Sequence, residues 1–390
     1  MTSLSRGVRH RSAVVFVALV CAAVPCAVPV SSCSPSFSKA TQDKFAAALD
    51  KVMVEGKLPG AVAGAWVPGE GAWVSASGVA DFQNLKMMKV TDKFRIASIT
   101  KTFTATMVLR LVDEGKVALD DKLAKYVPQA PNAQNITIRE LLNHTSGVRD
   151  EDPEGKLHAE LSNNPLKEWK PLDVVLAYTG GRVQGEPGKA YEYSNAGYVL
   201  LGMVIEKATG QPVASVLKKK IADPLGLANT DFPSSPDITG DYAHGYNGDK
   251  DVTRMDMSWE FTAGAMISNL EDLRTWAKAL ATGKLVSKQM HQAQLTWIDV
   301  PGGRGEIKSG LGIEEEFGYL GHNGDNLGYQ SDMKYLPDKD ATIVVLFNKS
   351  SSGREDAQSN ERALTGLSDV VFPGKIPQWY EKAIAPPPAQ

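Results

Sequence analysis

Cysteine is scarce in this chain of 390 residues, and its three copies all fall within the first 33 residues, at Cys21, Cys26 and Cys33. The rest of the chain therefore has no disulfide framework, no thiolate metal site and no cysteine nucleophile. Its stability has to come from a hydrophobic core, and a chain of this length can build a large one.

An excess of one charge sign is also missing. Lys and Arg number 42 against 45 Asp and Glu, a formal net charge of −3, whereas proteins that bind nucleic acid usually show a strong basic bias. The densest basic run, Lys218-Lys219-Lys220, is expected to be a solvated helix end. The sequence therefore gives no electrostatic case for a nucleic-acid partner.

Several motifs that carry chemistry are absent. The chain contains no Gly-x-Ser-x-Gly elbow, no His-Glu-x-x-His, no phosphate-binding Gly-x-x-x-x-Gly-Lys and no Gly-x-Gly-x-x-Gly. The six histidines are scattered singly, which argues against a zinc site, and we expect the lone loop histidine His144 to be structural. Neither a metal nor a cofactor is expected.

Residues 1–33 have the features of an export signal. A basic segment with Arg6, Arg9 and Arg11 precedes an apolar run over 13–24 that Pro25 interrupts, too short for a membrane-spanning helix. The run ends at Val30-Ser31-Ser32-Cys33, which resembles a bacterial lipobox, in which the cysteine is lipidated. We expect an exported lipoprotein held by Cys33 at the outer face of the cell membrane; ordinary cleavage and secretion is the alternative.

Strand patterns lie near both ends of the remaining chain, and helical patterns fill its middle. Residues 60–67 and 72–79 predict a hairpin after a helix over 37–54, and 330–336 and 341–347 predict strands before a helix over 356–371. Residues 120–281 are predicted to be mainly helical. We expect an α/β domain over 34–375, a mixed antiparallel-sheet lobe flanked by helices with an inserted all-helical lobe, followed by a Pro-rich tail over 376–390. The junction of two such lobes is a usual place for a site.

Ser98-Ile99-Thr100-Lys101 is the first of three segments that point to one site. Ser-x-x-Lys also begins at Ser36, Ser215 and Ser331, but only Ser98 lies at the start of a long helical pattern. Ser98 and Lys101 then share one face of that helix. The helix N-terminus favours an oxyanion and lowers the cost of a neutral lysine, which can accept the serine proton. The alternative is that Ser98 is a helix N-cap.

Tyr193-Ser194-Asn195 and His322-Asn323-Gly324 are the other two segments. A phenol beside a lysine ammonium can lose or share its proton near neutrality and act as a general acid or base. The Asn195 amide could hold both Lys101 and a substrate amide. Glycines clustered around His322 before a strand suggest backbone held close to a ligand. Taken singly, these residues could instead be a structural tyrosine, an N-cap asparagine and a turn histidine.

Together, and in this order, the three segments resemble the motifs of the serine penicillin-recognising enzymes. Five blocks of the sequence are similar to the branch of that family that contains class C β-lactamases and secreted D-Ala-D-Ala carboxypeptidases: Phe94–Phe103, Leu141–Val148, Tyr193–Gly202, Pro224–Leu227 and Ala263–Leu273. The resemblance spans most of the chain after the leader. It implies a β-lactamase/DD-peptidase-like fold with the site where the two lobes meet.

The resemblance implies an extracytoplasmic serine hydrolase that works through an acyl-enzyme at Ser98. Lys101 would activate Ser98, and Tyr193 would be the general base and then the acid that protonates the leaving group. The substrate would be bound by Asn195, His322, Asn323, Gly324 and Asp325, with the backbone N–H groups of Ser98 and Asp325 forming the oxyanion hole.

The expected substrates are D-Ala-D-Ala peptides of the cell-wall peptidoglycan, with penicillins as slow acylators. An esterase or β-lactamase that uses the same residues is one alternative, and a non-catalytic cell-wall-binding lipoprotein is another.

Two departures from the family pattern bear on the substrate. The third motif is His-x-Gly rather than the Lys-Thr-Gly of class C β-lactamases, which favours the peptidases. Asp325 follows Gly324, and its carboxylate would repel a substrate carboxylate unless Arg304 or Lys308 offsets it. This favours an esterase or a D-amino-peptide hydrolase over an exopeptidase for free C-terminal D-Ala.

Overall fold

The computed structural model describes residues 35–152, 155–351 and 356–385. The expected leader and Cys33 lie outside these residues. Within the described ranges, one nine-stranded antiparallel sheet dominates, with the strand order β3-β2-β1-β13-β12-β11-β10-β9-β8. The strands of this sheet are β1 (Gly60–Val67), β2 (Gly71–Asp81), β3 (Lys86–Met87), β8 (Ile298–Asp299), β9 (Ile307–Ser309), β10 (Glu314–Glu316), β11 (Tyr319–Asn326), β12 (Tyr329–Leu336) and β13 (Ala341–Phe347).

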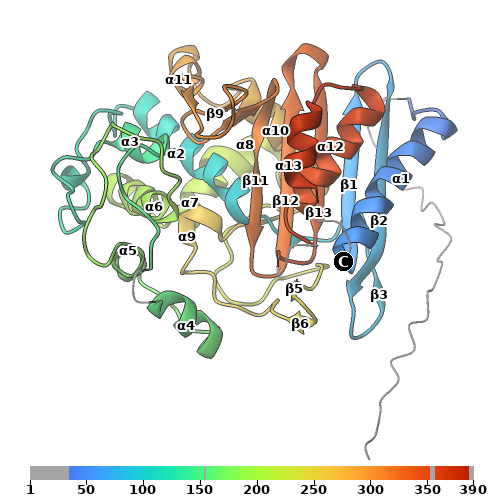
Figure 1. Cartoon of the computed structure of the whole chain (residues 1–390). Helices are drawn as coiled ribbons and strands as arrows, with labels where there is room; N and C mark the ends of the chain where they lie inside the picture. Colours follow the sequence, from blue (N-terminus) through green and yellow to red (C-terminus); the bar gives the residue numbers. More distant parts are fainter. Residues whose placement is uncertain (1–34, 153–154, 352–355, 386–390) are drawn as a thin grey trace, which may run out of the picture. The chain divides into compact units, whose positions relative to one another are not determined.

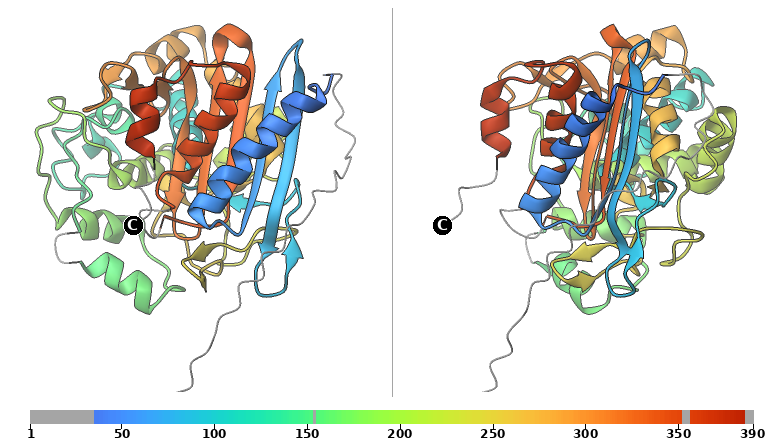
Figure 2. Two further views of the ribbon diagram at one scale, coloured as in Figure 1. Left: turned by 45° about the vertical axis from the view of Figure 1, so that its right-hand side comes forward. Right: turned by 90° about the vertical axis from the view of Figure 1, so that its right-hand side faces the viewer.

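Helices pack on both faces of the sheet. In both views of Figure 2, α1 (Lys39–Gly56), α12 (Ser359–Val371) and α13 (Gln378–Ile384) lie together on one face. Strand β1 shows why both faces are covered: Ala61, Ala63 and Ala65 are buried in the core under α1 and α12, whereas Val62 and Trp66 are buried in the core of the opposite face. This alternation is the period of two that a strand imposes.

The middle of the chain is mainly helical, and most of it lies to one side of the sheet in Figure 1. Its longer helices are α2 (Thr100–Asp113), α4 (Lys156–Asn163), α5 (Pro171–Thr179) and α6 (Asn195–Thr209), and its shorter ones are α3 (Ile138–Leu142), α7 (Val213–Leu217), α8 (Asp223–Leu225) and α9 (Phe261–Gly264). Helix α2 is buried along almost its whole length, since every residue from Thr100 to Leu109 is buried. It is therefore the central helix of this region.

The expected fold class is confirmed, with three differences in detail. Short strands interrupt the helical region: β5 (Tyr246–Asn247) pairs with β6 (Lys250–Asp251), and β7 (Ile267–Ser268) pairs with β4 (Phe94–Arg95), which precedes the region. Helix α10 (Leu270–Ala281) packs against β12 and β13, so the helical region ends before it. Helix α13 buries Tyr380 and Ile384 against the sheet side, and the packed part of the chain therefore extends beyond residue 375. A further helix, α11 (Lys288–Gln294), precedes β8.

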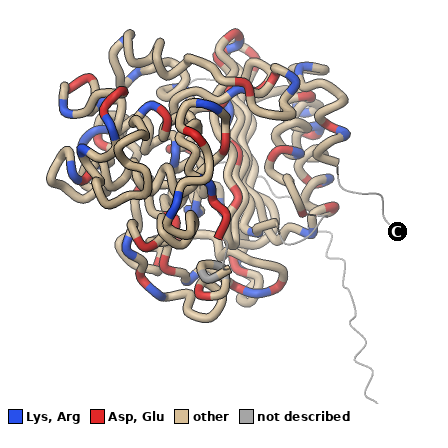
Figure 3. The backbone as a smooth tube through the Cα atoms, turned by 60° about the vertical axis from the view of Figure 1, so that its left-hand side comes forward, with Lys and Arg blue, Asp and Glu red and all other residues tan. Residues whose placement is uncertain are grey.

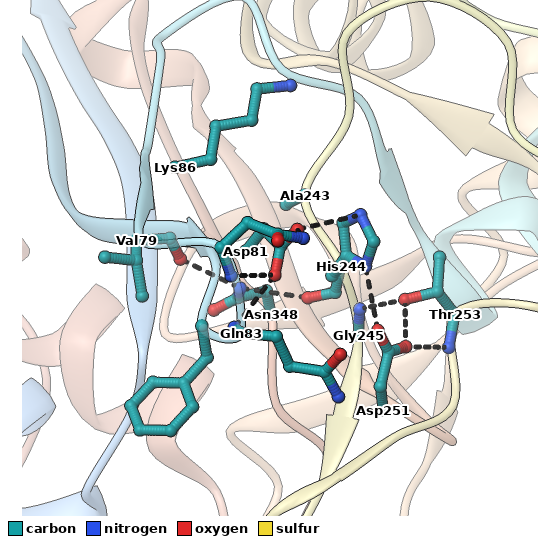
Figure 4. Close-up of polar contacts among 12 residues, drawn as sticks. Val79, Asp81, Gln83, Lys86, Ala243, His244, Gly245, Asp251, Thr253 and Asn348 are labelled. Carbon is teal, nitrogen blue, oxygen red and sulfur yellow. Dashed lines mark hydrogen bonds and ion pairs between the residues drawn. The ribbon is translucent and has the colours of Figure 1, made fainter.

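A polar cluster around His244 ties the β5–β6 hairpin to the end of β2 (Figure 4). His244 Nδ1 lies 2.8 Å from Asp251 Oδ2, and its Nε2 lies 3.7 Å from Asp81 Oδ2. Asn348, at the end of β13, donates to the carbonyl oxygens of Val79 and His244. The backbone N–H of Tyr246 on β5 also donates to the carbonyl of Gly328, in the turn between β11 and β12, so the cluster lies next to that turn.

Basic and acidic residues are interspersed along the described chain (Figure 3). None of the helices in the described ranges is long and apolar enough to cross a membrane.

Candidate active site

Ser98 lies in a short 3₁₀ turn, η1 (Ala97–Ile99), directly before α2. Ala97 has a φ of 47°, a region that alanine rarely occupies, and such strain is often found at functional turns. The hydroxyl of Ser331 on β12 donates to the carbonyl of Ile96 at 2.9 Å and so fixes the turn against the sheet. Ser331, which also begins a Ser-x-x-Lys match, therefore supports the Ser98 turn instead of competing with it.

Lys101 lies one turn into the helical segment and points its Nζ back at Ser98. Nζ is 2.9 Å from Ser98 Oγ, 2.7 Å from Asn195 Oδ1 and 2.9 Å from the carbonyl oxygen of Ala263. A neutral amine has two N–H groups, and it can donate them to Asn195 Oδ1 and to the Ala263 carbonyl oxygen. Its lone pair then faces the Ser98 hydroxyl, which is the arrangement a general base needs.

The charge state of Lys101 is set by two opposing effects. The side chain is fully buried, and burial lowers its pKa to about 8; Glu260, Asp150 and Glu314 oppose that shift. Burial likewise raises the pKa of Glu260 to about 7, and Lys101 opposes it. Around neutral pH, a fraction of Lys101 is therefore a free amine that can accept a proton.

Tyr193 completes the group around Ser98. Lys101 Nζ lies 4.8 Å from the centre of the Tyr193 ring, and the Tyr193 hydroxyl hydrogen-bonds Ser98. Although the side chain is 37 % exposed, burial of its hydroxyl end raises its pKa well above the usual value. The phenol therefore keeps its proton in the resting site, in contrast to the sequence-based expectation that it can lose that proton near neutrality.

His144 belongs to the site, although the sequence analysis treats it as a structural loop residue. Its ring stacks on Tyr193 at 4.5 Å between centroids, and its Nδ1 accepts a hydrogen bond from the backbone N–H of Ser194 at 3.1 Å. Burial, with Lys101 and His322 nearby, lowers its pKa well below the usual value, so the ring is neutral. His144 thus supports Tyr193 by packing, a role that its isolated position in the sequence does not reveal.

Asp150, which the sequence analysis does not single out, fixes the position of Asn195. Its carboxylate accepts hydrogen bonds from the backbone N–H groups of Asn195 and Ala196, the latter at 3.0 Å, and from the Ser194 hydroxyl at 3.2 Å. A carboxylate at the N-terminus of α6 is stabilised by the unpaired N–H groups and the helix dipole. Asp150 therefore sets the position from which Asn195 reaches Lys101.

The third motif lies on β11, which packs against the Ser98 turn. A Cβ on Gly324 would come within 2.7 Å of the Ile96 carbonyl oxygen, so only glycine allows this approach. His322 is buried, its ring centre lies 6.2 Å from that of Tyr193, and burial lowers its pKa to about 3. His322 and Gly324 are therefore brought to the site together with Ser98, Lys101, Tyr193 and Asn195.

Asn323 and Asp325 point to the other face of β11. Asn323 Nδ2 donates to Glu361 on α12 at 2.7 Å, and Asp325 hydrogen-bonds the backbone and hydroxyl of Ser351. Strand alternation separates both side chains from those of His322 and Gly324. The structure therefore does not bring the Asn323 and Asp325 side chains to Ser98, and only their backbone lies along the site.

The two cations expected to offset Asp325 are engaged elsewhere. Lys308 Nζ lies 3.0 Å from Glu315, and the Arg304 guanidinium lies 4.4 Å from the centre of the Trp379 ring on α13. Burial raises the pKa of Asp325 to about 6. Within the described ranges, no three His, Cys, Asp or Glu side chains are grouped so as to hold a metal ion.

Comparison with known proteins agrees with this geometry. The sequence model of the family described as Beta-lactamase matches residues 45–367. The chain belongs to the β-lactamase family. The expected family resemblance is confirmed, and the fold is that of β-lactamases and penicillin-binding proteins. The chain is accordingly a serine hydrolase of this family.

Curated relatives match most of this chain. A penicillin-binding protein of Bacillus subtilis (strain 168) is 28 % identical over 324 residues, which cover 77 % of this chain and 70 % of that protein. The chain spans only 54 % to 64 % of the length of other curated relatives that it matches.

Two solved structures are also similar at 28 % identity. The D-stereospecific amidohydrolase from a Streptomyces species superposes with a TM-score of 0.75, over 85 % of this chain and 98 % of that one. The D-amino acid amidase from Ochrobactrum anthropi SV3 superposes with a TM-score of 0.74, over 86 % of this chain and 99 % of that one.

Proposed function

We propose that this protein hydrolyses amides and peptides of D-amino acids through an acyl-enzyme formed on Ser98. The observation that carries the proposal is the contact of Lys101 Nζ with Ser98 Oγ, Asn195 Oδ1 and the Ala263 carbonyl, which orients the lone pair of a neutral Lys101 toward the serine. The D-amino-acid chemistry is suggested by the names of the two similar structures, an amidohydrolase and an amidase.

In the proposed acylation step, Ser98 Oγ attacks the substrate carbonyl carbon while its proton passes to Lys101 Nζ. The resulting oxyanion accepts hydrogen bonds from the backbone N–H groups of Ser98 and Asp325, and one such donor typically lowers the barrier by about 3 kcal/mol. Tyr193 donates its phenolic proton to the leaving nitrogen as the C–N bond breaks, and Lys101 returns the proton to Tyr193. Burial keeps the proton on the Tyr193 phenol, so the group carries the proton that this step consumes.

In the proposed deacylation step, water attacks the ester carbonyl and Ser98 regains its proton. Penicillins, which place a strained amide at the same carbonyl position, are expected to acylate Ser98 and leave slowly. Peptidoglycan-type D-Ala-D-Ala peptides remain within the proposed substrate class. An ester presents the same carbonyl carbon to Ser98, so esterase activity is the alternative within the same chemistry.

A substrate panel tests this proposal. D-Alanine p-nitroanilide, its L enantiomer and p-nitrophenyl acetate are compared with the wild-type protein, with Ser98→Ala as the control for background hydrolysis. We expect the D anilide to be hydrolysed faster than the L anilide. Turnover of the ester alone would assign an esterase, and the absence of turnover together with the absence of any acyl adduct would assign a non-catalytic binding protein.

The export signal and the lipid on Cys33 are a separate proposal, which rests on the sequence of residues 1–33. Labelling of the protein with radioactive palmitate in cells, and its loss in Cys33→Ala, would support a lipoprotein at the outer face of the membrane. A labelled signal equal in wild type and Cys33→Ala would contradict it.

A further inference from the structure

The carbonyl that accepts a hydrogen bond from Lys101 belongs to a strained turn. The Ala263 oxygen lies 2.9 Å from Lys101 Nζ, and Ala263 is part of α9, whose first residue, Phe261, has a φ of 37°. Bulky side chains rarely adopt a positive φ, and such strain persists only where the surrounding contacts hold it. We therefore asked which contacts hold α9 in place.

Thr262, the residue before Ala263, makes two of these contacts. Its hydroxyl donates to the Tyr198 carbonyl on α6 at 2.7 Å, and its carbonyl accepts a hydrogen bond from the Thr104 hydroxyl on α2 at 2.8 Å. Thr262 and Thr104 are both fully buried, so water cannot replace either partner, and a buried polar group without a partner is costly. Thr262 is thus fixed from two helices at once.

These two helices carry the other parts of the base. Lys101 lies in α2, and Asn195, which provides the second acceptor for Nζ, is the first residue of α6. The close approach of α6 to α9 depends on Gly202, because a Cβ there would lie 2.3 Å from Thr262 Oγ1 and 2.4 Å from Phe261 Cε1. The bonds of Thr262 therefore join the amine and both of its acceptors in one frame.

We infer that Thr262 is a positioning residue for the reaction: by joining α9 to α2 and α6, it holds the Ala263 carbonyl against one N–H of Lys101. The lone pair of the free amine then stays directed at Ser98. This inference rests on the proposed function and adds a residue to its mechanism. If the Ala263 carbonyl moved away, the neutral amine would keep only Asn195 as an acceptor, and its lone pair would be free to turn from Ser98.

The same displacement would also lower the pKa of Lys101. A carbonyl oxygen beside a buried ammonium stabilises the charged form, so its loss adds to the effect of burial. Other titratable groups that act on Lys101 or face it are Glu260, Asp150 and Glu314, which raise its pKa, and Tyr193, His144 and His322, which are neutral. A shift of the Lys101 pKa together with a slower reaction is therefore the signature of a displaced Ala263 carbonyl.

Valine in place of threonine keeps the shape of the side chain and removes the hydroxyl. Thr262→Val breaks the bond to α6, and Thr104→Val breaks the bond to α2. With D-alanine p-nitroanilide at pH values above the Lys101 pKa of about 8, each variant should lower kcat at least about tenfold with little change in KM. The acid limb of kcat/KM should move to lower pH. Thr262→Ser, which keeps the hydroxyl, should restore most of the kcat.

Thr106→Val is the matched control. Thr106 is buried on the same helix as Thr104, but its hydroxyl donates within that helix, to the Thr102 carbonyl at 2.9 Å. Its melting temperature reports the cost of losing a buried hydroxyl, while its kcat and acid limb should match those of wild type.

Two results would overturn the inference and leave the proposed function intact. One is a kcat in Thr262→Val equal to that of Thr106→Val, and the other is a lower kcat in Thr262→Val with the acid limb unmoved. A wild type that neither hydrolyses D-alanine p-nitroanilide nor forms an acyl adduct would overturn the proposed function, and the inference with it.

Discussion

The amine of Lys101 lies 2.9 Å from the hydroxyl of Ser98, and both groups sit where α2 begins. Two acceptors, Asn195 Oδ1 and the Ala263 carbonyl, hold the other positions around Nζ. Burial lowers the pKa of Lys101 to about 8. The contact between Ser98 and Lys101 therefore joins a nucleophile to a base that is available near physiological pH.

Glu260→Gln should move the acid limb of the pH profile of kcat/KM to lower pH. The Glu260 charge is the largest of those that raise the pKa of Lys101 against burial, so its removal lowers that pKa further. The pKa of Lys101, and with it the acid limb of the profile, should therefore fall by about one unit. The profile is measured with a p-nitroanilide substrate, and Glu271→Gln on the exposed side of α10 is the control. An acid limb that stays at the same pH, or that moves to higher pH, would contradict the assignment of Lys101 as the base.

Asn195→Asp should have the opposite effect. A carboxylate in place of the amide oxygen, 2.7 Å from Lys101 Nζ, stabilises the ammonium and raises the pKa of Lys101. The acid limb should then shift to higher pH, with slow turnover at neutral pH that recovers as pH rises. Asn195→Ala, which removes the hydrogen bond without adding charge, separates the two effects: we expect it to lower kcat without an upward shift of the limb.

His144→Asn should slow turnover more than it destabilises the fold. Asparagine tolerates the positive φ of 61° at this position, but it removes the ring that stacks on Tyr193. The loss of one aromatic contact, worth about 0.5–1.5 kcal/mol, predicts a fall of about two- to tenfold in kcat. The matched control is His291→Asn on α11, which should leave kcat unchanged. Equal kcat in wild type and His144→Asn would show that His144 does not support Tyr193.

Gly324→Ala should disable acylation while the protein stays folded. The new Cβ would lie 2.7 Å from the Ile96 carbonyl oxygen and 2.9 Å from the Ala97 Cβ, so β11 and the Ser98 turn have to separate. A displacement of this kind at the reacting atoms can cost about hundredfold in rate. In Gly366→Ala the added methyl meets Ala48 at an ordinary 3.5 Å, and this variant should keep wild-type acylation. Normal acylation in Gly324→Ala would exclude the close approach of β11.

The elements that carry the motifs could be predicted from the sequence because their signals are local. A serine at the start of an apolar helical pattern fixes Ser98 and Lys101 on one face, and α2 begins where that pattern does. The fold class followed from strand patterns at both ends and helices between them. The strands β5, β6 and β7 inside the helical region could not be predicted, because each is only two residues long.

The charged surroundings of Lys101 could not be predicted, since they depend on tertiary contacts. Asp150, Glu260 and Glu314 come from three distant segments with no shared motif. His144 had a usable signal, because the segment around it resembles a block of the family. Strand alternation also offered a signal that Asn323 and Asp325 face away from His322. The backbone contact of Gly324 with Ile96 has no counterpart in the sequence beyond the glycine itself.

The central claim is a covalent acyl-enzyme on Ser98, and the mass of the intact protein after incubation with benzylpenicillin tests it most directly. Wild type should gain the mass of one penicillin, and peptide mapping should place it on Ser98. Ser98→Ala should gain none, while Ser215→Ala, which also alters a Ser-x-x-Lys match, should still form the adduct. An adduct of equal yield in Ser98→Ala, or the absence of any adduct in wild type with penicillin and with an acylating D-alanyl ester, would contradict the account.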